Sequence, residues 1–259
     1  MTEKSPLIAP ALEEQLTTLF SRLTNEVELT AILGDDPKSA EMGVFLNHLT
    51  GLSPRLSVRF LAPGEDAALD EALDASLLPA TAVGNARMVF HGVPGGKEIT
   101  SFAGAILNAG LAAKPLDRFT LKDIAKIKSP LKLQVCVSLG CQHCAQLVVH
   151  AQRIAWENEL VTAHMIDANL YPHLVQALKL DRVPLTVVNG TKQIPGGKTM
   201  AELTSLLARY RSCSPSPKAP ALGDFLPSGR IECTNGTAAA KDFQISTFFY
   251  ICACCALTF

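Results

Sequence analysis

A short stretch that occurs twice is the strongest constraint on the fold of this chain. Residues 93–102 read VPGGKEITSF and residues 194–203 read IPGGKTMAEL, so Pro-Gly-Gly-Lys recurs 101 residues later. Both copies precede a helix-like pattern, and similarity at a fixed period indicates a repeated supersecondary unit. The chain is therefore expected to use the same unit twice.

The hydrophobic pattern in each half supports this interpretation. A helix-like spacing of Leu12, Leu16 and Leu19 comes first. The first half then suggests strands at 27–33, 55–62 and 87–92, with helices through 42–49 and from 98 to about 107. The second half suggests strands at 131–139, 160–167 and 183–190, with helices at 142–156, 171–180 and after 198. The order of elements is the same in both halves.

The repeated order β-α-β-α-β-β-α is typical of an α/β fold of the thioredoxin type, with mixed central sheets flanked by helices. We expect two fused thioredoxin-like (glutaredoxin-like) units in one compact body. The first covers residues 1–114 and lacks redox cysteines, an amphipathic connecting helix covers 115–127, and the second covers 128–211 with the Cys-x-x-Cys site. Residues 212–259 are expected to be a linker and tail.

Composition narrows the classes of partner. The chain has 259 residues, 48% of them hydrophobic, and a net charge of -1, which allows a large core and argues against nucleic acid as the main partner. Glu13 and Glu14 fall where a secretory signal needs an unbroken apolar run. No run in the body of the chain approaches the ~20 apolar residues of a membrane span. We therefore expect a cytoplasmic protein and not one associated with a membrane.

The stretch VSLGCQHC places Cys141 and Cys144 between a predicted strand and a predicted helix. In a reducing compartment such a pair is catalytic or metal-binding more often than structural. At a helix N-terminus the Cys141 thiolate is favoured, so Cys141 is the expected nucleophile and Cys144 the resolving thiol. His143 is expected to stabilise the thiolate, or else to be an exposed residue of little effect. Two inert buried thiols, or half of a zinc site, are the alternatives for the pair.

A proline directly before a strand adds a second part to this predicted site. The Val183-Pro184 bond is expected to be cis and to lie beside the cysteines, with the Val183 backbone pairing with an extended substrate segment. The alternative is an edge-strand proline in trans. An offset of about 104 residues sets Pro37 opposite Cys141 and Ala40 opposite Cys144, with Pro79 opposite Pro184. The first unit is thus expected to be a scaffold or a docking surface.

Five blocks in order carry a family resemblance: VELTAILGDDPKSAE, GGKEITSFAGAIL, VSLGCQHC, VPLTVVNG and GGKTMAEL. From about residue 10 to 210 the chain resembles the amino-terminal domain of the flavoprotein subunit of alkyl hydroperoxide reductase. The resemblance implies a dithiol carrier that passes electrons from a flavoprotein disulfide reductase to a peroxiredoxin in peroxide detoxification. It also implies that the carboxylate of Glu98 can accept the proton of Cys144, although the sequence shows only a glutamate in a first helical turn.

Two departures from the family pattern bear on the chemistry. Gln142 and His143 stand where the family usually has His and Asn. The family continues into domains that bind FAD and NADH through Gly-rich phosphate loops, and no such loop follows residue 210. We therefore expect no bound cofactor and no metal, a redox-active Cys141–Cys144 disulfide, and FAD and NADH on a partner reductase.

Other interpretations stay open at this point. A general glutaredoxin-like disulfide oxidoreductase is one alternative, and a non-catalytic docking or zinc-binding module is another. Cys136 is expected to be a small core residue, and His150, His164 and His173 to be structural or on the surface. The tail ends in ISTFFYICACCALTF, which suggests an altered reading frame or a short lipidated anchor.

Overall fold

The structure of the protein is a computed structural model that describes residues 3–112 and 115–210. The predicted linker and tail at 212–259 lie outside the described residues. The described part forms one compact unit up to Arg209.

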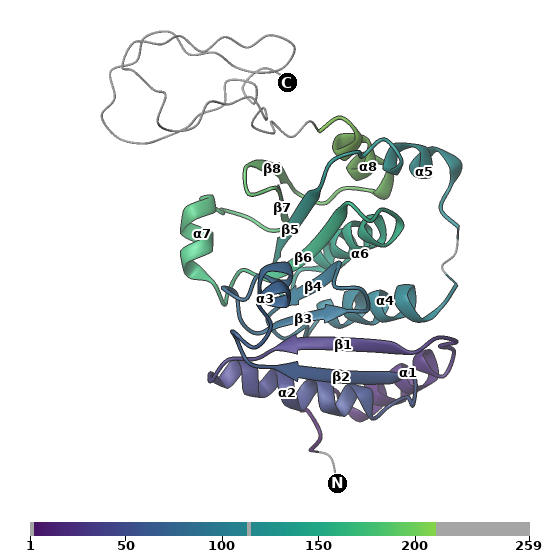
Figure 1. The fold of residues 1–259 in the computed structure, drawn as a ribbon, viewed down its shortest axis with the longest axis vertical. Helices are drawn as coiled ribbons and strands as arrows, with labels where there is room; N and C mark the ends of the chain where they lie inside the picture. Colours follow the sequence, from purple (N-terminus) through teal and green to yellow (C-terminus); the bar gives the residue numbers. More distant parts are fainter. Residues whose placement is uncertain (1–2, 113–114, 211–259) are drawn as a thin grey trace. The chain divides into compact units, whose positions relative to one another are not determined.

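Two runs of elements follow the predicted order (Figure 1). The leading helix is α1 (Pro10–Phe20), and the first repeat, residues 27–110, consists of β1 (Val27–Ile32), α2 (Pro37–Thr50), β2 (Leu56–Leu61), α3 (Ala67–Leu73), β3 (Ala80–Val83), β4 (Met88–His91) and α4 (Glu98–Gly110). The connecting helix is α5 (Arg118–Ile124), and the second repeat, residues 131–208, consists of β5 (Leu131–Val137), α6 (Gln142–Glu157), β6 (Val161–Asp167), α7 (Pro172–Leu178), β7 (Leu185–Val188), β8 (Lys192–Pro195) and α8 (Met200–Ala208).

The predicted β-α-β-α-β-β-α unit is confirmed in both repeats. The hydrophobic patterns described above did not single out α3, a helix of only seven residues. Asp66 caps this helix, since its side chain accepts hydrogen bonds from the backbone N–H groups of Ala68 and Leu69. A short capped helix of this kind has too few turns to show a clear periodicity.

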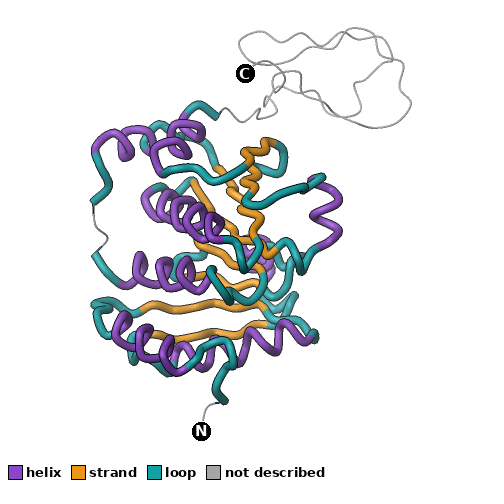
Figure 2. The backbone as a smooth tube through the Cα atoms, turned by 180° about the vertical axis from the view of Figure 1, so that it is seen from behind, coloured by secondary structure: helices purple, strands orange, loops and turns teal. Residues whose placement is uncertain are grey.

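The strands of both repeats form one continuous eight-stranded sheet in the order β2-β1-β3-β4-β6-β5-β7-β8. Strands β1 and β2 pair in parallel, β3 is antiparallel to both β1 and β4, and the second repeat copies this arrangement. The repeats are joined by parallel pairing of β4 with β6, in which Phe90 lies opposite Met165. The continuity of the sheet is visible from both sides of the molecule (Figures 1 and 2).

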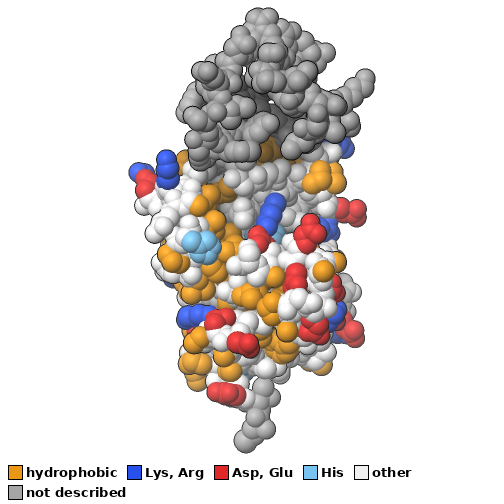
Figure 3. Space-filling model, turned by 60° about the vertical axis from the view of Figure 1, so that its left-hand side comes forward, with side chains coloured by type: hydrophobic (Ala, Val, Ile, Leu, Met, Phe, Trp, Pro, Cys, Tyr) orange, Lys and Arg blue, Asp and Glu red, His pale blue; other side chains and the backbone are white. Residues whose placement is uncertain are grey.

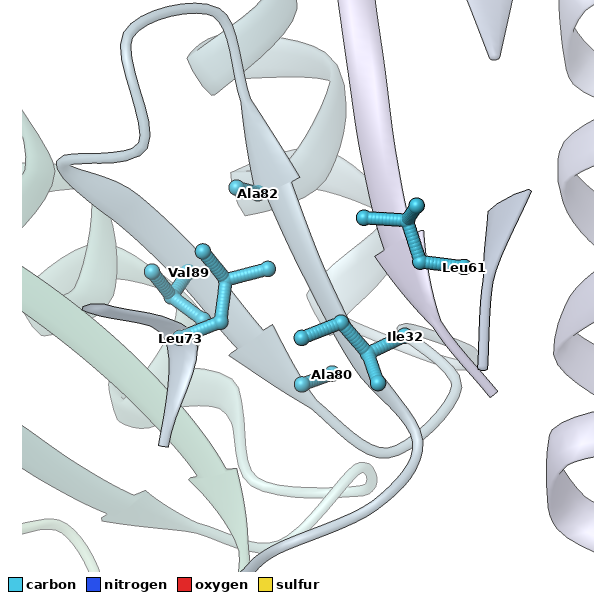
Figure 4. Close-up of a cluster of buried hydrophobic side chains, with 6 residues drawn as sticks. All are labelled: Ile32, Leu61, Leu73, Ala80, Ala82 and Val89. Carbon is cyan, nitrogen blue, oxygen red and sulfur yellow. The ribbon is translucent and has the colours of Figure 1, made fainter. Parts of the chain in front are cut away.

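Helices cover both faces of the sheet. Helices α4 and α6 pack side by side, as do α5 and α8, and Phe45 of α2 meets Phe102 of α4 edge to face at 5.8 Å between ring centroids. The opposite face is covered by α3 and α7. Leu73 of α3 packs on strands β1 to β4 in the cluster Ile32, Leu61, Leu73, Ala80, Ala82 and Val89 (Figure 4).

The second repeat has an equivalent cluster beneath α7. Cys136, Leu185 and Val187 pack there with Leu178 and Leu180. Burial raises the pKa of the Cys136 thiol to about 11, because the charged thiolate is poorly solvated there. The prediction that Cys136 is a core residue is confirmed.

On the face shown in Figure 3, acidic and basic side chains are interspersed among exposed hydrophobic ones, and the described residues form no large patch of a single charge there. None of the helices in the described ranges is both long enough and apolar enough to cross a membrane.

Candidate functional site: a disulfide at the start of α6

A four-residue turn connects β5 to α6 and carries the first cysteine. We call residues 138–141 the redox turn; it is closed by a hydrogen bond from the Cys141 N–H to the Ser138 carbonyl oxygen at 2.9 Å. Cys141 is the N-cap of α6, and Cys144 lies in its first turn. The two sulfur atoms form a disulfide, with 5.4 Å between the Cα atoms. The prediction that these two cysteines act as a pair thus has the required geometry.

The two thiols differ in their access to solvent. Cys141 is half-buried, whereas Cys144 is fully buried. No side chain caps the N-terminus of α6, which begins directly after Cys141, so the N–H groups of its first turn have no side-chain acceptor. These N–H groups and the positive end of the helix dipole favour a thiolate at Cys141 once the disulfide is reduced.

The Val183-Pro184 bond is cis, as predicted. The Pro184 carbonyl oxygen accepts a hydrogen bond from Gly196 at 2.9 Å. Within the described ranges, neither the N–H nor the carbonyl of Val183 has a hydrogen-bond partner. An extended segment of another chain can therefore pair with the Val183 backbone without displacing an internal bond.

The equivalent cis-proline site of the first repeat is blocked by other residues of the chain. Its Leu78-Pro79 bond is also cis, but the Leu78 carbonyl accepts a hydrogen bond from the Tyr171 hydroxyl at 3.0 Å. His91 Nδ1 donates to the neighbouring Leu77 carbonyl at 2.8 Å. Because Tyr171 belongs to the second repeat, the second repeat itself occupies the corner that would otherwise be open on the first.

The structure corrects the predicted match between the two repeats. Pro37 and Ala40 do not occupy the positions of Cys141 and Cys144; Asp36 and Ser39 do, since Asp36 is the N-cap of α2 and Ser39 is buried as Cys144 is.

The reason for this correction lies in the strand before each helix. Strand β5 has seven residues and β1 has six, so the match between the repeats moves by one residue before α6 begins. The Ser39 hydroxyl donates to the Asp36 carboxylate at 2.6 Å. A hydrogen-bonded pair therefore stands in the first repeat in place of the disulfide.

His143 is exposed on the first turn of α6. It lines a hollow of about 190 Å³ together with Gln146, Leu147, Gly197, Lys198, Thr199 and Glu202. This hollow lies between α6 and the start of α8. The tuning role of His143 stays a prediction.

Glu98 is the first residue of α4 and is fully buried, although it was predicted from the sequence only as a first-turn glutamate. One carboxylate oxygen accepts a hydrogen bond from the Ser101 hydroxyl at 2.5 Å, while the other has no partner in the described part of the chain. Burial, together with the nearby charge of Asp167, raises the pKa of Glu98 to about 7, although the hydrogen bond from Ser101 opposes the shift.

Glu98 lies next to a direct contact between the repeats. The backbone N–H of Lys97 donates to the carbonyl oxygen of Leu139 in the redox turn at 2.9 Å. The first repeat thus reaches the turn that leads into Cys141. This contact was not predicted, because no local pattern indicates which loop of one repeat meets the other.

The three histidines that were predicted to be structural or on the surface have such positions. His150 bonds the Lys198 carbonyl through Nδ1 at 2.9 Å, His164 is buried against His91, and His173 is exposed. Among the residues that the structure describes, no group of three or more His, Cys, Asp or Glu side chains could hold a metal ion.

Comparison with known proteins agrees with this geometry. A family model for a thioredoxin domain matches residues 131–208, which is the second repeat. The solved structure of a mutant of the alkyl hydroperoxide reductase component AhpF from Enterococcus faecalis is 31% identical, with a TM-score of 0.72. The match covers 77% of this chain and 98% of that chain. This chain belongs to the AhpF family.

The solved NTD_N/C domain of the E. faecalis AhpF is 30% identical, covering 77% of this chain and 99% of that chain, with a TM-score of 0.73. Among curated proteins, the AhpF of Staphylococcus aureus is 28% identical over 204 residues. That match spans 78% of this chain and 38% of the staphylococcal protein, so the chain covers well under half the length of this relative. A protein disulfide oxidoreductase from Aeropyrum pernix, 16% identical with a TM-score of 0.69, shares the fold. The resemblance stated from the sequence is confirmed.

Proposed function

We propose that this chain is a thiol–disulfide oxidoreductase that carries electrons through Cys141 and Cys144, from a flavoprotein disulfide reductase to a peroxiredoxin in peroxide detoxification. One observation carries the proposal: a disulfide whose first cysteine is half-buried at an uncapped helix N-terminus, whereas its second is fully buried. The open backbone of Val183 and the membership of the AhpF family agree with it.

The proposed reaction begins with the reduced chain. The Cys141 thiolate attacks one sulfur of the partner's disulfide, forming a mixed disulfide and releasing the other partner sulfur as a thiolate. The Cys144 thiol then loses its proton and attacks the Cys141 sulfur. The second partner thiolate leaves, the partner has gained two electrons and takes up two protons, and the chain holds the Cys141–Cys144 disulfide.

Glu98 is the proposed acceptor of the Cys144 proton. A buried carboxyl group with a pKa of about 7 can exchange a proton near neutral pH, which suits general acid–base work. One of its oxygens has no partner among the described residues and is therefore available to a proton donor.

In this scheme the chain does not take electrons directly from a nicotinamide nucleotide. We propose that FAD and NADH belong to the reductase and that the chain itself binds no cofactor. Electrons then enter by the reverse thiol exchange, in which a reductase dithiol reduces the Cys141–Cys144 disulfide.

Cysteine substitutions test the proposal directly. In Cys144→Ser we expect a stable mixed disulfide between Cys141 and a peroxiredoxin, because no resolving thiol remains one helical turn away. In Cys141→Ser we expect no exchange. Mass spectrometry of the trapped complex, and peroxide-dependent NADH oxidation with a flavoprotein reductase added, measure both.

The control is Cys136→Ser, since the Cys136 thiol is buried in the core and its high pKa leaves it unreactive. Cys136→Ser should exchange as the parent does. Turnover of Cys144→Ser at the parental rate would show that another cysteine resolves the complex, and the proposal would be wrong.

A further inference from the structure

The loop between β4 and α4 in the first repeat reaches the redox turn of the second. This loop covers residues 92–97, whereas its counterpart between β8 and α8 covers only 196–199. Gly92 and Gly196 are equivalent, because each donates to the carbonyl of its cis-proline at 2.9 Å. The two Pro-Gly-Gly-Lys copies therefore do not superimpose: Pro195 ends β8, while Pro94 lies inside the longer loop.

The extra length of this loop places Lys97 against Leu139. The Lys97 N–H donates to the Leu139 carbonyl at 2.9 Å, and Cys141 is two residues further along the redox turn. In a four-residue turn the orientation of the central peptide groups sets the direction in which the chain leaves. A fixed Leu139 carbonyl therefore fixes the position of Cys141 relative to the start of α6.

Residue 96 must be glycine for two reasons, its backbone conformation and the lack of space for a side chain. Its φ is +56°, in the left-handed region that favours glycine. A Cβ at this position would lie 2.6 Å from the Leu139 carbonyl oxygen and 3.3 Å from the Leu139 carbonyl carbon. Any side chain at residue 96 must push the redox turn away.

We propose that Gly96 and the backbone N–H of Lys97 are positioning groups for Cys141, so that the redox-silent first repeat sets the reactivity of the thiol in the second. This inference rests on the proposed function of Cys141 as the nucleophile. It gives the first repeat a defined role beyond that of a scaffold. The Lys97 side chain, which is exposed, has no part in it.

Lys97→Pro tests the hydrogen bond, because proline lacks the N–H. The φ of Lys97 is -74°, which proline adopts, and the proline Cδ would take the place of the amide hydrogen against the Leu139 oxygen, so the substitution both removes the bond and displaces the carbonyl. Lys97→Ala is the matched control, since it removes the side chain and keeps the N–H. We expect the alkylation rate of reduced Cys141 at neutral pH to fall by about fivefold in Lys97→Pro, the effect of losing one hydrogen bond, and to stay unchanged in Lys97→Ala.

Gly96→Ala tests the close approach independently. Its matched control is Gly190→Ala, because Gly190 has a similar φ of +70° and open space around the added Cβ. Both variants should lose thermal stability through backbone strain. In Gly96→Ala alone, the midpoint of Cys141 alkylation against pH should rise and the Cys141–Cys144 couple should become more reducing, since the displaced thiolate is less well stabilised.

The readouts are alkylation at Cys141 followed by mass spectrometry, equilibration with glutathione, and the melting temperature. The inference is overturned if Lys97→Pro and Gly96→Ala keep the parental alkylation midpoint and potential, whatever their melting temperatures. A parent that fails to reduce any peroxiredoxin would refute the proposed function instead, because alkylation of Cys141 needs no partner and still reports its positioning.

Discussion

At the scale of single residues, the site depends on where each ionisable group lies. Cys141 is placed at an uncapped helix start, where its charged form is favoured, whereas the buried Cys136 is held as a neutral thiol. Glu98 is buried as well, and its carboxyl group is protonated more readily than usual. Burial and helix position therefore decide the protonation of each of these three groups.

Glu98→Gln is expected to change the pH dependence of stability. The pKa of Glu98 is raised to about 7 from 4.5, so its stabilising effect is fully present below pH 4.5 and is lost as the pH rises through 7. Relative to the parent, Glu98→Gln should gain up to about 3 kcal/mol in the free energy of unfolding between pH 4.5 and 8. Urea titrations at both pH values measure this change.

Because each protein is measured at both pH values, any pH-independent change in the free energy of unfolding caused by the introduced amide cancels. Glu202→Gln is not a suitable control, because Glu202 completes the capping box of α8. Glu157→Gln, at an exposed residue paired with Arg153, should show little change with pH over the same range. Equal pH dependence in Glu98→Gln and the parent would mean that Glu98 ionises normally.

At the scale of elements, the junction of the repeats is a pair of strands with two buried histidines. His91 of β4 and His164 of β6 share a hydrogen bond of 3.0 Å between Nε2 and Nδ1. Because His91 Nδ1 faces the Leu77 carbonyl, it must carry the proton, and His91 Nε2 accepts from His164. The ion pair between Asp74 and Lys132, at 2.6 Å, also joins the repeats near these rings.

We expect the free energy of unfolding of His91→Leu to fall less steeply with decreasing pH than that of the parent. Burial lowers the pKa of His91 to about 4, so the stability it contributes is present above pH 6.5 and is lost as the pH falls through 4. The variant should be less stable at pH 7 by about 1–3 kcal/mol, since the Leu77 carbonyl loses its partner. Its further loss between pH 6.5 and 4.5 should be smaller than that of the parent.

Chemical unfolding at these two pH values checks the expectation, with His173→Leu as the control because His173 is exposed. Ionisation of Glu98 changes the free energy of unfolding in the opposite direction over part of this pH range. The pH dependence of each variant is therefore compared with that of the parent. If His91→Leu lost stability in acid as steeply as the parent, the histidine pair would not be the acid-sensitive element.

At the scale of the whole described unit, the two repeats are parts of one sheet. The β4–β6 pairing is supported by further contacts between the repeats, including those of Tyr171 with Leu78, Lys97 with Leu139, and Lys132 with Asp74. Both β4 and β6 lie inside the sheet, with a paired strand on each side. The first repeat lacks a redox pair, but it shares one sheet with the second repeat and contacts it at several places.

We expect residues 3–210 to unfold in a single cooperative transition. Separating the repeats would expose the pairing edges of β4 and β6 and leave the buried His91 and His164 without their mutual hydrogen bond. Calorimetry should give equal calorimetric and van't Hoff enthalpies for this transition. Two resolved transitions, one of them unaffected by reduction of the Cys141–Cys144 disulfide, would show that the repeats unfold independently.

Features that depend on neighbours along the chain could be predicted from the sequence. The repeat, the order of the elements and the thiols at the start of α6 follow from hydrophobic periodicity and punctuation over stretches of some ten to twenty residues. The cis Val183-Pro184 corner was also predictable, because a proline just before a strand of this fold has a limited set of roles. The family resemblance drew on the same local blocks.

Features that depend on residues far apart in the sequence could be seen in the folded chain alone. The extra residue of β5 sets Asp36 and Ser39, and not Pro37 and Ala40, at the positions of the disulfide, and hydrophobic patterns do not fix a strand end to one residue. A first-turn glutamate looks alike whether it is exposed or buried, so the raised pKa of Glu98 depends on packing. The bond from Lys97 to Leu139 exists because β4 pairs with β6, and that pairing is a property of the assembled sheet.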